Sequence, residues 1–190
     1  MTVKSITYFE KSGSKNTDET LNLAYKRASE LEIRDIVVAS THGKTALKTA
    51  EIFDTKKNNI VAVTISEGFQ AEGWTMTVEE RKRLQDKGVK VLTCIHALGG
   101  DLGSAFTDKN GGTTIHEAVC QTLYRFCQGM KVAVEIILMA ADAGLIPVDK
   151  EVIAIAGTGT GADTAIVVQP AYSRKFFDLK IKEIIAKPRE

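Results

Sequence analysis

Two short loops hold the residues whose types and spacing could bind an anion. The first follows an apolar segment at 36–39 and leads into a helical pattern with Ala46, Leu47, Ala50 and Phe53 on one side. Free backbone N–H groups and the helix dipole favour an anion at such a junction, and hydroxyl and ammonium groups add donors. The pattern predicts a phosphate site, with a simple capped turn as the alternative. The loop consists of Ser40, Thr41, His42, Gly43, Lys44 and Thr45.

The run Gly43-Lys44-Thr45 also invites comparison with the phosphate-binding loop of NTPases. That motif requires another glycine five residues before Gly43, where this chain has Val38. In addition, no expected strand ends in the aspartate that a magnesium nucleotide site needs. The sequence therefore disfavours an NTPase.

The second loop is rich in glycine and joins one apolar run to another. Its spacing resembles a dinucleotide fingerprint, but that fingerprint must open a helix, whereas here the β-branched run AIVVQ follows. Repeated glycines permit positive φ angles, and successive N–H groups can then form a concave nest for an anion. The alternative is a flexible hairpin loop without a ligand. The loop consists of Gly157, Thr158, Gly159, Thr160, Gly161, Ala162, Asp163 and Thr164.

Three ionisable residues share one side of a very apolar segment at 130–143. At about 100° per residue, Lys131, Glu135 and Asp142 fall within roughly 40° of one another. Such a stripe can line a site. More commonly such a stripe either faces solvent or forms Lys–Glu support at i,i+4, and one of these two arrangements is our expectation here.

The three histidines are separated by strands and loops, so their spacing does not indicate a metal cluster. His42 belongs to the first loop and could contact a ligand. His96 ends a strand in the expected crevice, whereas His116 lies in the first turn of a helix and is expected on the surface. We recognise no Ser-His-Asp or Cys-His arrangement, so no catalytic residue is assigned.

Alternating strands and helices in the first half of the chain must position these groups. Such an order predicts right-handed crossovers and a parallel sheet with helices on both faces. Asn16 with Glu19, and Thr77, are the expected N-terminal caps of the first and third helices, and Gly88 ends the third. We expect strands at 5–9, 36–39, 59–65 and 89–95, and helices at 17–31, from 44 onward and at 78–87.

The second half is less regular. The segment 97–112 is glycine-rich and longer than the usual connection, which predicts a functional or disordered loop. Thr114 and Glu117 form a capping box for a helix at 114–127, and Gly129 is expected to separate that helix from the one at 130–143. Strands are expected at 152–156, 165–169 and 181–186.

The composition is that of an ordinary soluble globular protein, with 190 residues, 44% hydrophobic residues and a net charge of +1. The balanced charge argues against a nucleic-acid partner and against a polybasic membrane surface. The amino terminus lacks the apolar region of a signal peptide, which predicts a cytoplasmic location. Cys94, Cys120 and Cys127 form no CxxC pair, so we expect reduced thiols, with Cys120 and Cys127 on one helix face in the core.

Four segments carry a resemblance to a known family: VVASTHGKTALKTAEIF, NIVAVTISEGF, GVKVL and IAIAGTGTGADTAIVVQP. They resemble the carboxy-terminal α/β domain of pyruvate kinase. Two further segments, VAVEIILMAADAGLIP and FFDLKIKEIIAKPR, resemble the small stand-alone proteins built from this domain, and that likeness covers essentially the whole chain. We therefore expect one domain over residues 1–190, a three-layer α/β/α architecture with a mainly parallel sheet and an antiparallel hairpin near one edge.

In pyruvate kinase this domain holds no catalytic residues, and its two corresponding loops bind the phosphates of an allosteric sugar bisphosphate. The resemblance thus implies phosphate binding without pyruvate kinase activity, because the catalytic barrel is absent from this sequence. The stand-alone proteins look like FMN binders. This implies FMN as the cofactor, with its phosphate in the same two loops.

Ligands of doubly wound sheets bind outside the carboxyl ends of the strands, which adds Ser66, Gly68 and Phe69 to the expected site. The segment 98–112, together with Trp74, is expected to cover the flavin ring. The expected partner is a small phosphate-bearing ligand, and a homo-oligomer is left open. Two alternatives to FMN binding remain: a sensor of a phosphorylated sugar, and an enzyme that acts on a phosphosugar through Glu135, Asp142 or His96.

Overall fold

A mixed sheet of seven strands organises the chain. The computed structural model describes residues 3–100 and 102–190. The strand order is β1-β7-β6-β5-β2-β3-β4, in which β6 runs antiparallel to β5 and β7 while the other neighbouring pairs are parallel. The expected α/β fold with its antiparallel hairpin is therefore confirmed. The strands are β1 (Thr7–Phe9), β2 (Asp35–Ala39), β3 (Asn59–Val63), β4 (Lys90–Leu92), β5 (Val152–Ala156), β6 (Thr164–Gln169) and β7 (Lys180–Pro188).

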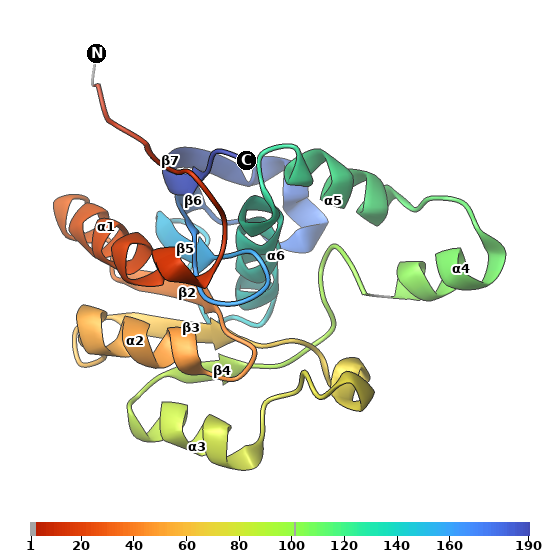
Figure 1. The fold of residues 1–190 in the computed structure, drawn as a ribbon, viewed down its shortest axis with the longest axis horizontal. Coiled ribbons are helices and arrows are strands. Elements are labelled where there is room, and N and C mark those ends of the chain that lie inside the picture. Colours follow the sequence, from red (N-terminus) through yellow and green to blue (C-terminus); the bar gives the residue numbers. More distant parts are fainter. Residues whose placement is uncertain (1–2, 101) are drawn as a thin grey trace.

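Helices cover both faces of this sheet (Figure 1). Their bounds are α1 (Thr17–Glu30), α2 (Lys44–Phe53), α3 (Val78–Asp86), α4 (Leu102–Asn110), α5 (Ile115–Tyr124) and α6 (Gln128–Asp142), with short 3₁₀ helices η1 (Ser14–Asn16), η2 (Glu67–Glu72) and η3 (Ser173–Asp178). Leu21, Phe53 and Leu84 bring α1, α2 and α3 into one core cluster with the sheet. Met130 and Ile137 of α6 belong to a second cluster on the opposite face.

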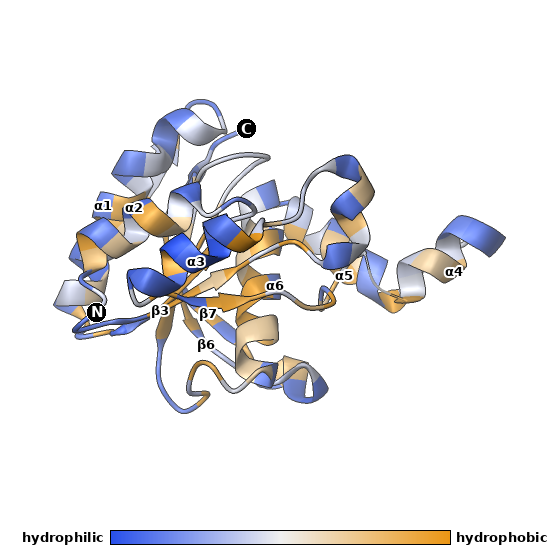
Figure 2. Cartoon of the chain, turned by 90° about the horizontal axis from the view of Figure 1, so that it is seen from below, coloured by the Kyte–Doolittle hydropathy of each residue, from blue (hydrophilic) through white to orange (hydrophobic). Residues whose placement is uncertain are grey.

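The burial of each element follows from its apolar pattern. Every residue of β5 is buried, as a strand covered on both faces requires. The long apolar run of α6 is buried between the sheet and a third cluster that includes Leu98 and Cys120. Figure 2 shows the contrast between hydrophobic α6 and the largely hydrophilic α3. In the described part of the chain, no helix has the length and apolar character that a membrane crossing needs.

Four local expectations are wrong. The segment 97–112 is not irregular throughout, because residues 102–110 form α4, which projects from the body of the domain (Figure 1). Gly129 lies inside α6 rather than before it. The Asn16 side chain does not cap α1 but donates to the carbonyl oxygen of Lys11 at 2.8 Å. Cys127 is buried as expected, yet it precedes α6 and does not share a helix with Cys120.

Candidate functional site

A pocket of about 1100 Å³ opens at the carboxyl ends of β2, β3 and β5. These three strands are parallel neighbours, so the segments that follow them meet at one edge of the sheet, as is usual for ligand sites in such folds. The pocket reaches both faces of the sheet, because α2 contributes from one side and α6 from the other. Both loops that the sequence singled out line it.

The first loop connects β2 to α2 and leaves backbone N–H donors unpaired with the described residues at the N-terminus of α2. The Ser40 N–H donates to the Val63 carbonyl oxygen at 3.0 Å, and the Ser40 hydroxyl accepts from the Ala46 N–H at 3.2 Å. In the described part of the chain, the N–H groups of Lys44 and Thr45 have neither a backbone nor a side-chain acceptor. Together with the helix dipole, these free donors are what the predicted phosphate site would use.

Gly43 permits this turn. Its φ of +81° lies in the left-handed region, where residues with a side chain are strained. A Cβ at this position would also lie 3.1 Å from Cδ1 of Leu84 on α3. Gly43 therefore has a structural role beneath the loop and does not line the pocket.

The glycine-rich loop faces the first loop across the pocket lining. Gly161 has a φ of +74°, and a Cβ on it would lie only 2.4 Å from the Thr17 hydroxyl oxygen. The Ala162 N–H donates to that same oxygen at 3.0 Å, so the loop is packed tightly against the start of α1. Gly157, Gly159, Thr160 and Gly161 line the pocket, in the part of the loop where the sequence predicts an anion nest.

Asp163 fixes the base of the glycine-rich loop. The residue is fully buried, and one carboxylate oxygen accepts from the N–H groups of Gly13 at 2.8 Å and Thr158 at 3.2 Å. The other oxygen accepts from the Thr164 hydroxyl at 2.9 Å. Asp163 is absent from the pocket lining, so its position suits a positioning residue rather than a ligand contact.

The N-terminal segment forms a wall of the pocket that the sequence pattern did not indicate. Ser14 and Thr17 line the pocket beside the glycine-rich loop. The segment reaches this place because β1 pairs with β7 at the sheet edge. Strand order is a tertiary property, and no local signal in residues 5–17 reveals it.

Helix α6 supplies the largest apolar part of the wall through Val132, Ile136 and Met139. Of the two expected arrangements of its ionisable stripe, Lys–Glu support at i,i+4 is confirmed for Lys131 and Glu135. Exposure to solvent is wrong for both residues, which are buried and line the pocket. Asp142 is exposed and accepts hydrogen bonds from Ser173 instead, outside this pocket.

The Lys131 ammonium donates to a Glu135 oxygen at 2.7 Å. Burial lowers the pKa of Lys131, but the charge of Glu135 and this hydrogen bond raise it more, so its pKa lies above the usual value. The Lys131 side chain is therefore a cation in the pocket wall and not a free amine nucleophile. The other Glu135 oxygen accepts from the Leu98 N–H at 3.0 Å.

Three aromatic rings stack at the pocket rim. Phe69 lies between Trp74, at 5.9 Å between ring centroids, and His96, at 6.0 Å, with the rings nearly parallel in both pairs. Trp74 and His96 line the pocket. Burial lowers the pKa of His96, and the nearby Glu135 charge offsets this only in part. The His96 imidazole is thus neutral at neutral pH.

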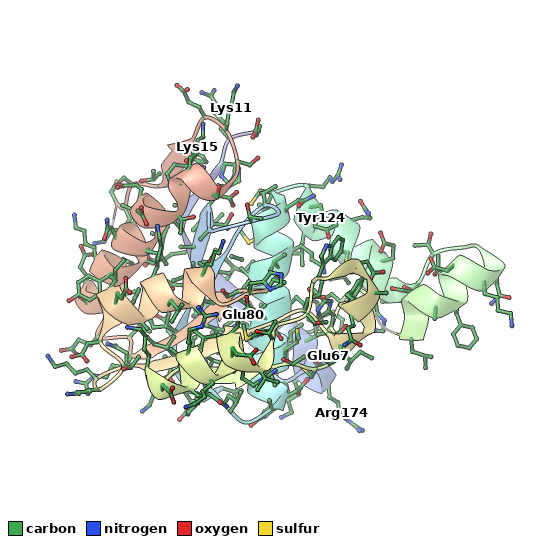
Figure 3. All side chains as sticks on the ribbon, turned by 60° about the horizontal axis from the view of Figure 1, so that its bottom comes forward. Lys11, Lys15, Glu67, Glu80, Tyr124 and Arg174 are labelled. Atoms are coloured by element: carbon green, nitrogen blue, oxygen red, sulfur yellow. The ribbon has the colours of Figure 1, made fainter. Side chains whose placement is uncertain are left out.

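His42 approaches the pocket from the side of α3. Its Nδ1 lies 3.3 Å from a carboxylate oxygen of Glu80, which is labelled in Figure 3. Glu80 also accepts from the Thr77 N–H and so completes the expected cap of α3. The hydrogen bond from Thr77 and the neighbouring His42 outweigh the effect of burial and lower the pKa of Glu80.

The structure brings most of the expected ligand contacts together. Those that line the pocket are Ser40, Thr41, His42, Lys44, Thr45, Gly157, Gly159, Thr160 and Gly161. Those outside the lining are Gly43, Ser66, Gly68, Phe69, Thr158 and Asp163. The described residues of 98–112 do not line the pocket either, and His116 is exposed on α5 as expected. Among the described residues, no group of three or more His, Cys, Asp or Glu side chains could hold a metal ion.

Comparison with known protein families matches residues 18–168 to the family described as "Pyruvate kinase, alpha/beta domain". The chain belongs to this family. The match contains both loops of the pocket and the whole of α6. Ser14 and Thr17, together with β1 and β7, lie outside the matched part of this pyruvate kinase alpha/beta domain protein.

Proposed function

We propose that the protein binds FMN, with the flavin phosphate between the α2 N-terminus and the glycine-rich loop. The convergence of these two donor-rich loops on one pocket carries the proposal. Another part of the wall is apolar and aromatic, through Val132, Ile136 and Met139 of α6 and through Trp74. A molecule with a phosphate at one end and a flat apolar ring system suits both parts.

The residues present fit such a group. The free N–H groups of Lys44 and Thr45 and the charge of Lys44 would hold the phosphate, while Val132, Ile136 and Trp74 would contact the ring system. The pocket volume of about 1100 Å³ slightly exceeds the roughly 300–1,000 Å³ typical of small-molecule sites. Bound FMN supplies redox chemistry of its own, and the chain would bind it, orient it and exclude water.

A sugar phosphate could use the same donors, but Val132, Ile136 and Met139 offer its hydroxyl groups no hydrogen-bond partners. Buried hydroxyls without partners weaken binding, so this part of the wall suits a flavin ring better than a sugar. The two ligands are distinguished by the absorption spectrum and by thermal stabilisation.

The experiment begins with the visible spectrum of the purified protein and a titration with FMN. We expect either a flavin band or uptake of added FMN, with quenching of Trp74, the single tryptophan of the chain. Lys44→Ala combined with Gly159→Val should weaken FMN binding by more than about tenfold, because a charge-assisted contact is worth roughly 1.5–3 kcal/mol. Lys57→Ala, at an exposed lysine outside the pocket, is the control.

Two results would contradict the proposal. A colourless protein that takes up no FMN, but whose Tm rises with sugar phosphates, would overturn FMN binding, because a ligand of the native state must stabilise it. FMN binding that the double variant leaves unchanged would show that the phosphate lies elsewhere.

A further inference from the structure

A buried ion pair in the pocket wall is left unused by phosphate binding. Lys131 and Glu135 lie one turn apart on α6, with side chains only 8% and 6% exposed. Both belong to the lining, on the opposite face of the sheet from α2. Around them α6 contributes the apolar residues Val132, Ile136 and Met139, and its first residue, Gln128, is the other polar group that the helix adds to the lining.

Glu135 uses both of its oxygens in hydrogen bonds, whereas Lys131 does not use all of its donors on the described residues. Glu135 is engaged through both oxygens, one with the Lys131 ammonium and one with the Leu98 N–H. The ammonium has three N–H donors, and in the described part of the chain Glu135 takes one of them. The carboxylate therefore holds the ammonium in place, and donors remain on Lys131 for a ligand in the pocket.

Fold stability does not require these two residues to be charged, because an uncharged glutamine at position 135 could also accept from the Leu98 N–H. Taking two charges out of water costs several kcal/mol per ion, and apolar residues of similar volume are often as stable or more so. Most of the neighbouring residues in α6 are apolar, yet these two positions hold charged residues. An ion pair that stability does not require, on the wall of a pocket, indicates ligand recognition.

We propose that the Lys131 ammonium, positioned by Glu135, binds an oxygen of the ligand that carries negative charge, at a point separate from the phosphate loops. The ligand class is then a phosphate ester whose other part bears a carboxylate or a ring carbonyl able to take up negative charge. This inference rests on the proposed function for the position of the phosphate. For FMN, the group concerned is the pyrimidine carbonyl edge of the flavin ring.

The test replaces the ion pair by neutral groups of similar shape. In Lys131→Met combined with Glu135→Gln, the glutamine oxygen still accepts from the Leu98 N–H and no buried charge is left alone. The matched control is Lys82→Met with Asp86→Asn, an i,i+4 pair of the same kind on the exposed face of α3, with a Lys–Asp distance of 2.9 Å. Circular dichroism confirms that each variant is folded at the assay temperature.

Two quantities are measured with FMN as the probe. The first is the FMN dissociation constant, which should rise by about tenfold or more in the neutral variant and stay unchanged in the control. The second is the dissociation constant for sulfite addition to bound FMN. The adduct places negative charge on the pyrimidine edge, so the neutral variant should bind sulfite at least tenfold more weakly. Unchanged values for both quantities would overturn the role of Lys131.

Failure of the proposed function gives a different pattern. If the wild-type protein binds no FMN, thermal shifts with 6-phosphogluconate and sorbitol 6-phosphate, which differ only in the carboxylate, test Lys131 directly. Preference for the acid in the wild type, lost in the neutral variant, supports the inference without FMN. Equal shifts, or no shift with either compound, overturn it. If the neutral variant does not fold, Lys131→Gln replaces it, because the glutamine amide can still donate to Glu135.

Discussion

Asp163→Ala tests whether the buried carboxylate braces the glycine-rich loop. Sequence reasoning had placed Asp163 among the ligand contacts, whereas in the structure it accepts three hydrogen bonds from the protein itself. Two of these donors are backbone N–H groups, that of Thr158 within the loop and that of Gly13 in the N-terminal segment. The alanine variant leaves both of them, and the Thr164 hydroxyl, without this partner.

The expected loss of stability follows from these three contacts. A hydrogen bond to a charged group contributes roughly 1.5–3 kcal/mol, and because Gly13 and Thr158 are only partly buried, water can replace some of the loss. We therefore take the lower end and expect Asp163→Ala to lower the free energy of unfolding by about 4–5 kcal/mol. Asp163→Asn keeps one oxygen for both N–H groups and exchanges charged for neutral hydrogen bonds, so its loss should be about 2 kcal/mol.

The assay is urea unfolding followed by circular dichroism, together with the Tm of each variant. At about 2–4 °C per kcal/mol for a chain of this size, the alanine variant should unfold roughly 8–20 °C below the wild type. The Asn variant should unfold between the two. FMN affinity of the Asn variant, measured well below its Tm, should remain within about threefold of the wild type, because Asp163 is outside the pocket lining.

Two results would refute this reasoning. A loss below about 1 kcal/mol for Asp163→Ala would show that the three hydrogen bonds do not hold the loop. A drop of more than about tenfold in FMN affinity for Asp163→Asn, with stability nearly intact, would show that the carboxylate contacts the ligand.

Two further substitutions probe how the site is supported. Gly129→Ala would place a Cβ 2.1 Å from the Thr164 hydroxyl oxygen. This overpacking should lower the free energy of unfolding, measured with urea, by about 1–3 kcal/mol. In the control Gly68→Ala the nearest contact of the new Cβ is 3.8 Å, so the free energy of unfolding should change little. Glu183→Gln replaces one of the two oxygens that accept from Arg27, at 2.7 and 2.6 Å, by an amide NH2 group and removes the negative charge, which should cost about 1 kcal/mol at neutral pH. Hydrogen bonding from Arg27 lowers the pKa of Glu183 in the folded protein. The stabilisation by Glu183 is therefore complete above the pKa of this carboxyl in the unfolded chain, and it is lost as pH falls through the lower pKa of the folded state. The stability difference between wild type and variant should shrink on acidification, and a constant difference would contradict this.

Sequence reasoning found the two loops because their signals are local. A run of small and hydroxyl residues between a buried strand and an amphipathic helix has the same meaning wherever the strand lies in the sheet. The expected strand positions also hold, since apolar runs such as 152–156 are buried in the middle of the sheet. The carboxyl ends of parallel strands then bring the loops together without further information.

The rest of the site depends on contacts that periodicity does not encode. The spacing of Lys131 and Glu135 gives their common side of α6, but not that the side faces a pocket rather than solvent. The stack of Phe69 with Trp74 and His96 joins two segments from separate connections of the sheet. The helix α4 was missed because flanking glycines in 97–112 dominate the local pattern.

The pocket is completed by parts of the chain outside the matched family segment, and this bears on ligand choice. Residues 18–168 supply the phosphate loops and α6, but Ser14 and Thr17 close the side next to the glycine-rich loop. Asp163 accepts from Gly13, and the Ala162 N–H donates to Thr17, so the N-terminal segment and the loop hold each other in place. If the two loops bind the phosphate as proposed, the matched part of the chain supplies the anion contacts, and the N-terminal segment changes the shape of the pocket beside them. The loops would then set the class of ligand, and the walls formed by α6 and the N-terminal segment would select its member.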